Sequence, residues 1–257
     1  MLRFTANLSV LFTELPLQQR FKAAKEHGFN AVEIQFPYEL SAATIRTELD
    51  KHQLQLVLFN VPADDLLQGG EGLAAVPAKQ AQFKDAVAQT IAYAKILKPT
   101  VINILPGCCF EPLHLSKYQQ TFKDNLRYAL NAFSPLGIKT VFEAVNTINM
   151  PGFIIHNSAQ MLAILQEINH PDLRMQYDIY HMQMMQEDPI RFIAQNAHKI
   201  GHIQFADCPG RHQPGTGNID FQQLFTAIKN SAYTGWTGAE YIPSENSAAS
   251  LTWLQQK

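Results

Sequence analysis

The sequence predicts an α/β protein that forms a single (β/α)8 TIM barrel over residues 1–257. Three observations support this fold. Short β-rich runs alternate with amphipathic segments along the whole chain, without a break at mid-chain. The length of 257 residues is near the ~250 residues typical of such barrels. The composition, 46% hydrophobic and 16% charged, suits a compact fold with much buried surface.

Eight β-rich runs are predicted as the strands. Their residue ranges are 3–8, 31–36, 54–60, 100–105, 139–146, 174–181, 201–207 and 236–242. Between them, apolar residues recur at three- and four-residue spacing, which is typical of amphipathic helices. One helix is predicted over 18–27 and ends at Gly28 in a C-cap position. A longer, Ala-rich helix is predicted over 78–97, with Pro99 just beyond its end.

An open doubly wound sheet is the competing fold. Strands that alternate with helices pair in parallel through right-handed crossovers in both architectures. An open sheet that binds a nucleotide carries a Gly-rich first turn and usually has fewer strands. The first turn here is Ser9-Val10-Leu11-Phe12, which contains no glycine. The number of units and this turn therefore favour the closed barrel.

Charge and composition exclude two classes of partner. The formal net charge is -2, the sequence pI is about 6.5 and the charges are dispersed, so no field attracts nucleic acid or an anionic membrane. No apolar run approaches the ~20 residues of a spanning helix. The start of the chain is interpreted as a strand and not as a signal peptide. Three cysteines suggest no disulfide framework and suit a reducing compartment. We expect a cytoplasmic protein, and the sequence leaves homo-oligomer formation open.

Polar side chains interrupt four predicted strands near their C-terminal ends. Barrel strands are buried on both faces and are normally near-continuous runs of Val, Ile and Leu. The exceptions, on strands five to eight, are Glu143, Asp178, Gln204 and Glu240. Because the strands of a barrel end at the same mouth, we expect these four groups to lie along one arc of it.

These four groups need a counter-charge. A buried carboxylate costs several kcal/mol unless it is paired or bound to a metal. All four side chains offer oxygen, which favours a hard divalent cation, Mg²⁺ or Mn²⁺, over zinc. A single acidic residue in a strand is more often a salt-bridge partner, but four at matching positions indicate a shared site. Glu33, on the second strand, has the same pattern, and its role stays open between pocket and ion pair.

Two further residues are candidate substrate contacts. His181 comes three residues after Asp178, where it either reaches a bound oxygen or lies on the surface. Arg211 lies in the loop after strand seven, where it either clamps a carboxylate bidentately or is a solvated loop cation. Gly215-Thr216-Gly217, in the same loop, lacks the Gly-Lys-Ser/Thr of a phosphate loop and indicates a turn.

The same segments resemble the hydroxypyruvate isomerase family, within the xylose-isomerase-like barrel superfamily. The resemblance covers essentially the full length of the chain. It rests on Phe142-Glu143-Ala144-Val145-Asn146, Asn149-Met150-Pro151-Gly152, Gln176-Tyr177-Asp178-Ile179-Tyr180-His181-Met182-Gln183, His202-Ile203-Gln204, Pro209-Gly210-Arg211-His212, Pro214-Gly215-Thr216-Gly217 and Glu240-Tyr241.

The resemblance implies an aldose-ketose type isomerase that interconverts two small hydroxy-keto acids, hydroxypyruvate and 2-hydroxy-3-oxopropanoate (tartronate semialdehyde). It implies that Glu143 and Glu240 donate and accept the proton, and that His181 and Arg211 contact the substrate. The metal ligands that it implies are Glu143, Asp178, Gln204 and Glu240. Related ketose epimerases have His as the third ligand, so Gln204 argues against a sugar epimerase.

Three alternatives remain. A sister isomerase of 2-oxo-tetronate, or a related ketose isomerase or epimerase, would use the same site, and loops 62–77 and 209–218 would set the pocket depth that separates the substrates. An endonuclease of abasic DNA needs a His-rich, multi-metal mouth and a basic surface. The net charge of -2 and the amide of Gln204 argue against it. A non-catalytic ligand-binding protein has no use for paired glutamates.

Overall fold

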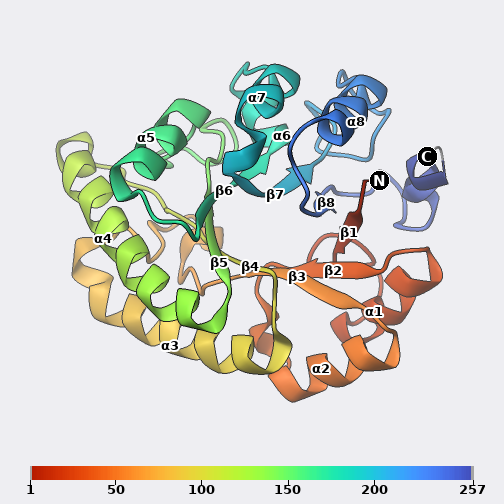
Figure 1. Cartoon of the computed structure of the whole chain (residues 1–257), viewed down its shortest axis with the longest axis horizontal. Coiled ribbons are helices and arrows are strands. Elements are labelled where there is room, and N and C mark those ends of the chain that lie inside the picture. The colour runs from red at the N-terminus through yellow and green to blue at the C-terminus, as the bar shows by residue number, and fades with distance from the viewer. Residues whose placement is uncertain (1, 256–257) are drawn as a thin grey trace.

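The computed structural model describes residues 2–255, and they form a closed barrel of parallel strands (Figure 1). Each strand pairs with the next along the chain, and the last pairs with the first. The strands are β1 (Phe4–Asn7), β2 (Ala31–Ile34), β3 (Gln55–Asn60), β4 (Val101–Ile104), β5 (Lys139–Glu143), β6 (Leu173–Asp178), β7 (Ile200–Phe205) and β8 (Thr237–Ala239). The predicted (β/α)8 TIM barrel is confirmed.

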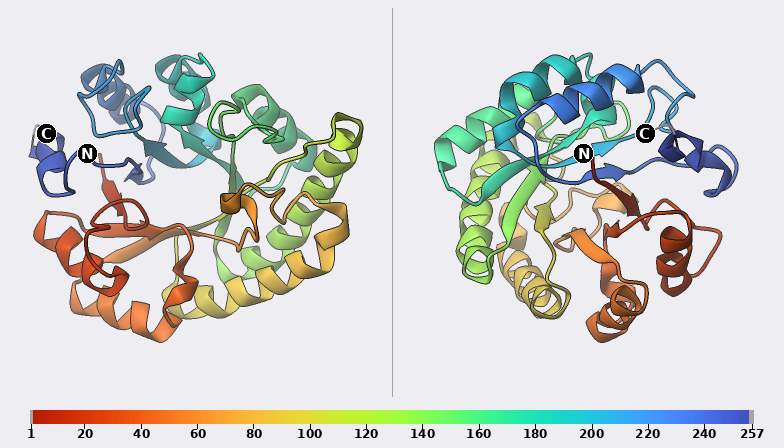
Figure 2. Two further views of the ribbon diagram at one scale, coloured as in Figure 1. Left: turned by 180° about the vertical axis from the view of Figure 1, so that it is seen from behind. Right: turned by 45° about the vertical axis from the view of Figure 1, so that its right-hand side comes forward.

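Helices surround the barrel on its outside, as the views in Figures 1 and 2 show. They are α1 (Leu17–Glu26), α2 (Ala42–Lys51), α3 (Gln80–Leu97), α4 (Leu115–Phe133), α5 (Ser158–Ile168), α6 (Ile179–Met184), α7 (Pro189–Asn196) and α8 (Phe221–Asn230). The two helices predicted over 18–27 and 78–97 correspond to α1 and α3, with small differences at their ends. Within residues 2–255, no helix combines the length and the apolar character that crossing a membrane requires.

The predicted strands five, six and eight are too long at their C-terminal ends. β8 ends at Ala239, so Glu240 lies one residue beyond the strand. β5 ends at Glu143, and residues 144–146 lie outside the sheet. β6 ends at Asp178, because the side chain of this residue accepts hydrogen bonds from the backbone N–H groups of Tyr180 and His181 and starts α6. His181 therefore lies in a short helix at the barrel mouth, and the strand predicted to reach residue 181 is wrong.

The interior of the barrel has an apolar floor and a polar upper layer. Side chains two positions apart on a strand point to the same face of a sheet. Val101 of β4 and Val141 of β5 belong to one buried apolar cluster. Two positions further along these strands lie the buried residues Asn103 and Glu143. The alternation thus directs the polar groups into the barrel, toward the C-terminal mouth where such folds build their sites.

The opposite faces of the strands pack against the helices. Tyr177 of β6 stacks on Phe192 of α7 with ring centroids 4.6 Å apart. Phe142 of β5 meets Phe122 of α4 edge to face at 5.9 Å. Aromatic pairs of this kind contribute about 0.5–1.5 kcal/mol beyond the area that they bury. Because Phe142 is held on the outside, its neighbour Glu143 must point to the inside.

The loop after β7 folds around one carboxylate. Asp207 is wholly buried. It accepts hydrogen bonds of 2.8–3.1 Å from the backbone N–H groups of Cys208, Gly215, Thr216, Gly217 and Ile219. Its own carbonyl oxygen accepts from Arg211 N at 2.8 Å. Residues 215–217 therefore form a turn, as expected from the sequence, and Asp207 organises the loop that carries Arg211.

We predict that Asp207→Asn lowers the free energy of unfolding by about 2–3 kcal/mol, since hydrogen bonds to a charged acceptor contribute about 1.5–3 kcal/mol each. Asparagine keeps one acceptor oxygen and places an NH2 group against backbone N–H groups. Urea denaturation measures the change.

The matched control is Asp220→Asn. Asp220 caps α8 through one hydrogen bond, from the Gln223 N–H at 2.9 Å. Asparagine caps helices as well as aspartate does, so we expect a change below about 0.5 kcal/mol. Equal losses in the two variants would contradict the role given to Asp207.

Candidate functional site

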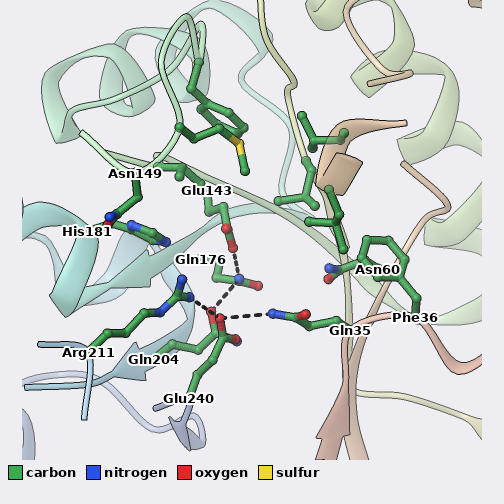
Figure 3. Close-up of a pocket in the computed structure, with 16 residues that line it drawn as sticks. Gln35, Phe36, Asn60, Glu143, Asn149, Gln176, His181, Gln204, Arg211 and Glu240 are labelled. Carbon is green, nitrogen blue, oxygen red and sulfur yellow. Dashed lines mark hydrogen bonds and ion pairs between the residues drawn. The ribbon is translucent and has the colours of Figure 1, made fainter. Parts of the chain in front are cut away.

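A cavity of about 170 Å³ opens at the mouth of the barrel (Figure 3). It is smaller than the ~300–1,000 Å³ of pockets for drug-sized ligands, so it suits a small molecule. Part of its wall is polar and comes from the ends of β5 to β8. The apolar part of the wall comes from Phe36, Leu66, Leu67, Leu105, Val145, Met150 and Phe153.

The structure brings most of the predicted site residues to this cavity. The residues that line it are Glu143, His181, Gln204, Arg211 and Glu240. Asp178 is buried beside the cavity but does not line it. Its Oδ1 accepts from the N–H groups of Tyr180 at 2.8 Å and His181 at 3.3 Å, and its Oδ2 lies 3.6 Å from His181 Nε2. Asp178 therefore anchors the helix that carries His181.

Two buried amides link the two glutamates. Gln176 Nε2 donates to Glu143 Oε2 and, at 2.6 Å, to Gln204 Oε1. Gln204 Nε2 donates to Glu240 Oε2. The chain of hydrogen bonds thus runs from β5 across β6 and β7 to the residue after β8. The sequence analysis assigned no role to Gln176. One sequence feature could have identified Gln176: it is a lone amide in a buried strand, two positions before Asp178 and hence on the same face.

Glu240 is held by four side-chain donors. They are Asn7 Nδ2 at 2.7 Å and Gln204 Nε2 on Oε2, and Gln35 Nε2 at 3.1 Å and Arg211 Nη2 at 2.8 Å on Oε1. These four contacts use about all the acceptor sites of a carboxylate. Burial raises the pKa of Glu240, and the Arg211 guanidinium opposes this shift. The contacts favour an ionised Glu240. Gln35 and Asn7 are further residues that the sequence analysis missed.

Glu143 has fewer partners and no ion pair. Its Oε2 accepts from Asn103 Nδ2 at 3.2 Å and from Gln176 Nε2, and no other hydrogen bond reaches it from residues 2–255. Burial raises the pKa of Glu143 well above its ordinary value, and the negative charge of Glu240 adds to the shift. Two buried carboxyl groups with unlike surroundings tend to share one proton, with one ionised and the other neutral.

His181 is held as a neutral imidazole. Asn146 Oδ1 accepts from the backbone N–H groups of Ile148 and Asn149, at 3.1 and 2.8 Å, so its NH2 group faces the histidine. His181 Nδ1 lies 2.7 Å from Asn146 Nδ2 and must accept this hydrogen bond. Its proton is therefore on Nε2. Burial lowers the pKa of His181 to about 4, which keeps the ring neutral at neutral pH.

Arg211 is the cation of the cavity. Its backbone has a φ of 57°, in the left-handed region, and Ile242 N donates to its carbonyl oxygen at 2.9 Å. The guanidinium lies 5.2 Å from the centre of the Tyr180 ring, and its Nη2 contacts Glu240 Oε1. An arginine has five N–H donors, so this side chain can bind a second anion while it holds Glu240.

The side chains around the cavity offer oxygen atoms of the kind that bind a divalent cation. Glu143, Asp178 and Glu240 are three buried carboxylates. Among residues 2–255, the one Lys or Arg side chain that forms an ion pair with any of them is Arg211, which contacts Glu240. An unpartnered buried oxygen, Oε1 of Gln176, adds a donor of the same hard type. No group of three or more His, Cys, Asp and Glu side chains among residues 2–255 lies in a metal-binding arrangement. The four-ligand Mg²⁺ or Mn²⁺ site therefore stays a prediction.

Known proteins match the chain over almost its whole length. Residues 21–257 match the family model described as xylose isomerase-like TIM barrel. Hydroxypyruvate isomerase of Escherichia coli (strain K12) is 39% identical over 254 residues, which are 99% of this chain and 98% of that protein. The 2-oxo-tetronate isomerase of Cupriavidus necator is 35% identical over 253 residues, 98% of this chain and 97% of that protein.

A solved structure agrees closely with the fold. The crystal structure of AP endonuclease, family 2, from Brucella melitensis matches with a TM-score of 0.95 at 36% identity, and covers 100% of this chain and 99% of its own. The resemblance noted in the sequence is thus confirmed over the full chain. The chain belongs to the hydroxypyruvate isomerase family of xylose isomerase-like TIM barrels and is an enzyme of the isomerase class.

Proposed function

We propose that this enzyme interconverts hydroxypyruvate and 2-hydroxy-3-oxopropanoate by proton transfer between neighbouring carbons. The observation that carries the proposal is the placement of Glu143 and Glu240 on one small cavity beside Arg211. A carboxylate substrate needs a cation, and a proton shuttle needs one ionised and one protonated group. The three side chains meet both needs, and the 39% identity to a hydroxypyruvate isomerase supports the choice of substrate.

The two glutamates act as base and acid. Glu240, which is paired with Arg211, removes the proton from C3 of hydroxypyruvate. The electron pair of the C–H bond forms a C2–C3 double bond, and the π pair of the C2 carbonyl moves onto its oxygen. Glu143 then returns a proton to C2. The roles exchange in the reverse direction. A base and an acid held in position each contribute about 10²–10⁴-fold to the rate.

Two other side chains complete the reaction. The proton of the C3 hydroxyl must move to the C2 oxygen as the aldehyde forms, and neutral His181 relays it. Arg211 binds the substrate carboxylate with the N–H groups that do not contact Glu240. Since Glu143, His181 and Glu240 are buried, each of these contacts is stronger than it would be in water.

A bound Mg²⁺ or Mn²⁺ would be held by oxygens of Glu143, Asp178, Gln204 and Glu240. It would polarise the substrate oxygens and stabilise negative charge as the C–H proton leaves. A carboxylate that holds a cation is a weaker base, so each glutamate must turn one oxygen to the substrate. Oε1 of Glu240 does so when the substrate takes the place of Gln35 or Arg211, its two partners on the cavity wall. Glu143 Oε1 is free to do so, because both hydrogen bonds to this side chain end on Oε2.

A four-carbon substrate is the second candidate. The Cupriavidus necator relative is a 2-oxo-tetronate isomerase at 35% identity, which makes a longer acid the second candidate for the same residues. Leu66 and Leu67 belong to the apolar part of the cavity wall, which offers no hydrogen-bond partner to an added hydroxymethyl group. Polar groups lose hydrogen bonds against such a wall, which supports the three-carbon substrate.

An activity on abasic DNA has less support, although the Brucella melitensis protein is called an AP endonuclease. DNA binding depends on several Lys and Arg contacts to phosphates, and the net charge here is -2. Glu143 and Glu240 are only 7% and 5% exposed in a cavity of about 170 Å³, which leaves no room for a polymer.

We predict that Glu143→Gln and Glu240→Gln each lower kcat by at least about 100-fold, since each removes one partner of the proton transfer. Both variants should keep the circular dichroism spectrum of the parent. Glu48→Gln, on α2 away from the cavity, is the matched control and should keep the parent kcat. Near-normal rates in both cavity variants would rule out the proposed roles.

Deuterium labelling distinguishes the two substrates. In deuterated water, proton NMR should show exchange at C3 of hydroxypyruvate and deuterium at C2 of the product. A panel that includes 2-oxo-tetronate should give a lower kcat/KM for the longer acid. A higher kcat/KM for 2-oxo-tetronate would assign the enzyme to the sister activity instead.

A metal titration tests the cation site. We expect the chelator-treated protein to bind one equivalent of Mn²⁺, measured by electron paramagnetic resonance of free Mn²⁺. Gln204→Leu removes one proposed ligand and should weaken the affinity at least tenfold. Thr140→Val, a buried change in the barrel wall, should leave it unchanged. Equal affinities in the Gln204→Leu variant and the parent would contradict the ligand set.

A further inference from the structure

The carboxylate of Glu33 reaches across the barrel interior to β7. Glu33 belongs to β2 and is wholly buried, as is His202 of β7. Oε2 of Glu33 lies 2.7 Å from His202 Nε2. Oε1 accepts from Gln204 Nε2 at 2.7 Å and from Asn7 Nδ2 at 3.1 Å. Because β8 and β1 separate β2 from β7, these contacts exist only in the closed barrel.

Gly238 provides the space for this carboxylate. It lies on β8, in register with Gln204 of β7. A Cβ atom at residue 238 would stand 2.5 Å from Oε2 and 2.7 Å from Oε1 of Glu33, which is closer than real Cβ contacts allow. Any residue with a side chain would therefore displace Glu33 from its partners.

The contacts of Glu33 determine which way the Gln204 amide points. Both N–H groups of Gln204 Nε2 are used, one on Glu33 Oε1 and one on Glu240 Oε2. The amide oxygen must then point the other way, where Gln176 Nε2 donates to it at 2.6 Å. A reversed amide would place its oxygen against two carboxylate oxygens, which is repulsive.

Asn7 forms a second bridge of the same kind. Its Nδ2 donates to Glu33 Oε1 and to Glu240 Oε2, at 3.1 and 2.7 Å. Two amides thus connect one oxygen of Glu33 with one oxygen of Glu240. Glu33 does not line the cavity, so it has no contact with a bound substrate.

We propose that Glu33 is a positioning residue, which orients the Gln204 amide and holds the Oε2 side of Glu240 so that Oε1 faces Gln35 and Arg211 at the cavity wall. The inference rests on the proposed proton transfer by Glu240. A buried carboxylate costs stability, and an apolar residue of similar volume often fills such a position at lower cost. The benefit of Glu33 therefore lies in orientation. Mutation of a residue that hydrogen-bonds to a site residue commonly lowers activity or metal affinity by about 10–100-fold.

Glu33→Met tests the proposal, because it removes both acceptor oxygens and keeps the shape of the side chain. We expect kcat to fall about 10–100-fold with KM within about twofold of the parent. Gly238→Ala removes no polar group but displaces the same carboxylate, so it should reproduce the effect. Thr5→Val is the matched control. Thr5 is wholly buried in β1 and its hydroxyl has no partner among residues 2–255, so we expect parent kinetics.

The side-chain NH2 resonances of Gln204, in metal-free protein labelled with ¹⁵N-glutamine, give a readout that does not depend on activity. They are assigned by their loss in Gln204→Leu. Glu33→Met and Gly238→Ala should shift them, and Thr5→Val should not. Glu33→Gln, which retains one acceptor oxygen, should give an intermediate shift if Glu33→Met does not fold. A lower melting temperature with unchanged kcat and unchanged resonances would overturn the positioning role. If the resonances shift in Glu33→Met and Gly238→Ala but the parent protein has no isomerase activity, the proposed function alone is refuted.

Discussion

The repulsion between two carboxylates in one buried cavity is the constraint on which the rest of the site depends. Glu143 and Glu240 cannot both be ionised there without nearby compensation, because burial raises the pKa of each. The charge of Glu240 adds to the upward pKa shift of Glu143, and the charges of Asp178 and Glu33 add to that of Glu240. The protein compensates unequally. Glu240 receives Arg211 and three amide donors, whereas Glu143 receives amides alone. The same inequality is the basis for the separate roles of base and acid that we propose for the two glutamates.

Four buried carboxylates of this barrel fall into two kinds, according to the hydrogen-bond donors that they accept from. Asp178 and Asp207 accept backbone N–H groups, and each starts or shapes a segment at the mouth. Glu33 and Glu240 accept side-chain amides from other strands and hold the interior layer together. The first kind positions His181 and Arg211 on their short segments. The second kind orients the amides of Asn7 and Gln204 inside the barrel. The cavity therefore lies between these two sets of hydrogen bonds.

Much of the fold and part of the site could be predicted, for reasons that lie in particular residues. Glu143, Gln204 and Glu240 are polar interruptions in apolar runs, and strand alternation directs such residues into a barrel. Gln176 has the same property, but it precedes the more conspicuous Asp178 and received no role. Asn7 and Gln35 lie at strand ends, where polar residues are ordinary. The end of β6 was misplaced because Asp178 starts a helix, and a capping contact of this kind depends on three-dimensional geometry.

The sequence by itself determined the eight-unit barrel, the inward direction of the polar groups on the later strands and the membership of the isomerase family. The first two features follow from period-two and three- to four-residue patterns, which are local. The family membership follows from the resemblance of the motifs around Glu143, Asp178, Gln204 and Glu240 to known isomerases. Only the tertiary structure decided that Asp178 caps a helix beside the cavity, that Arg211 pairs with Glu240, and that Glu33 reaches His202 and Gln204. The contacts of Arg211 and Glu33 join segments far apart in the chain. They arise when the barrel closes, and strand register and loop geometry then bring the side chains together.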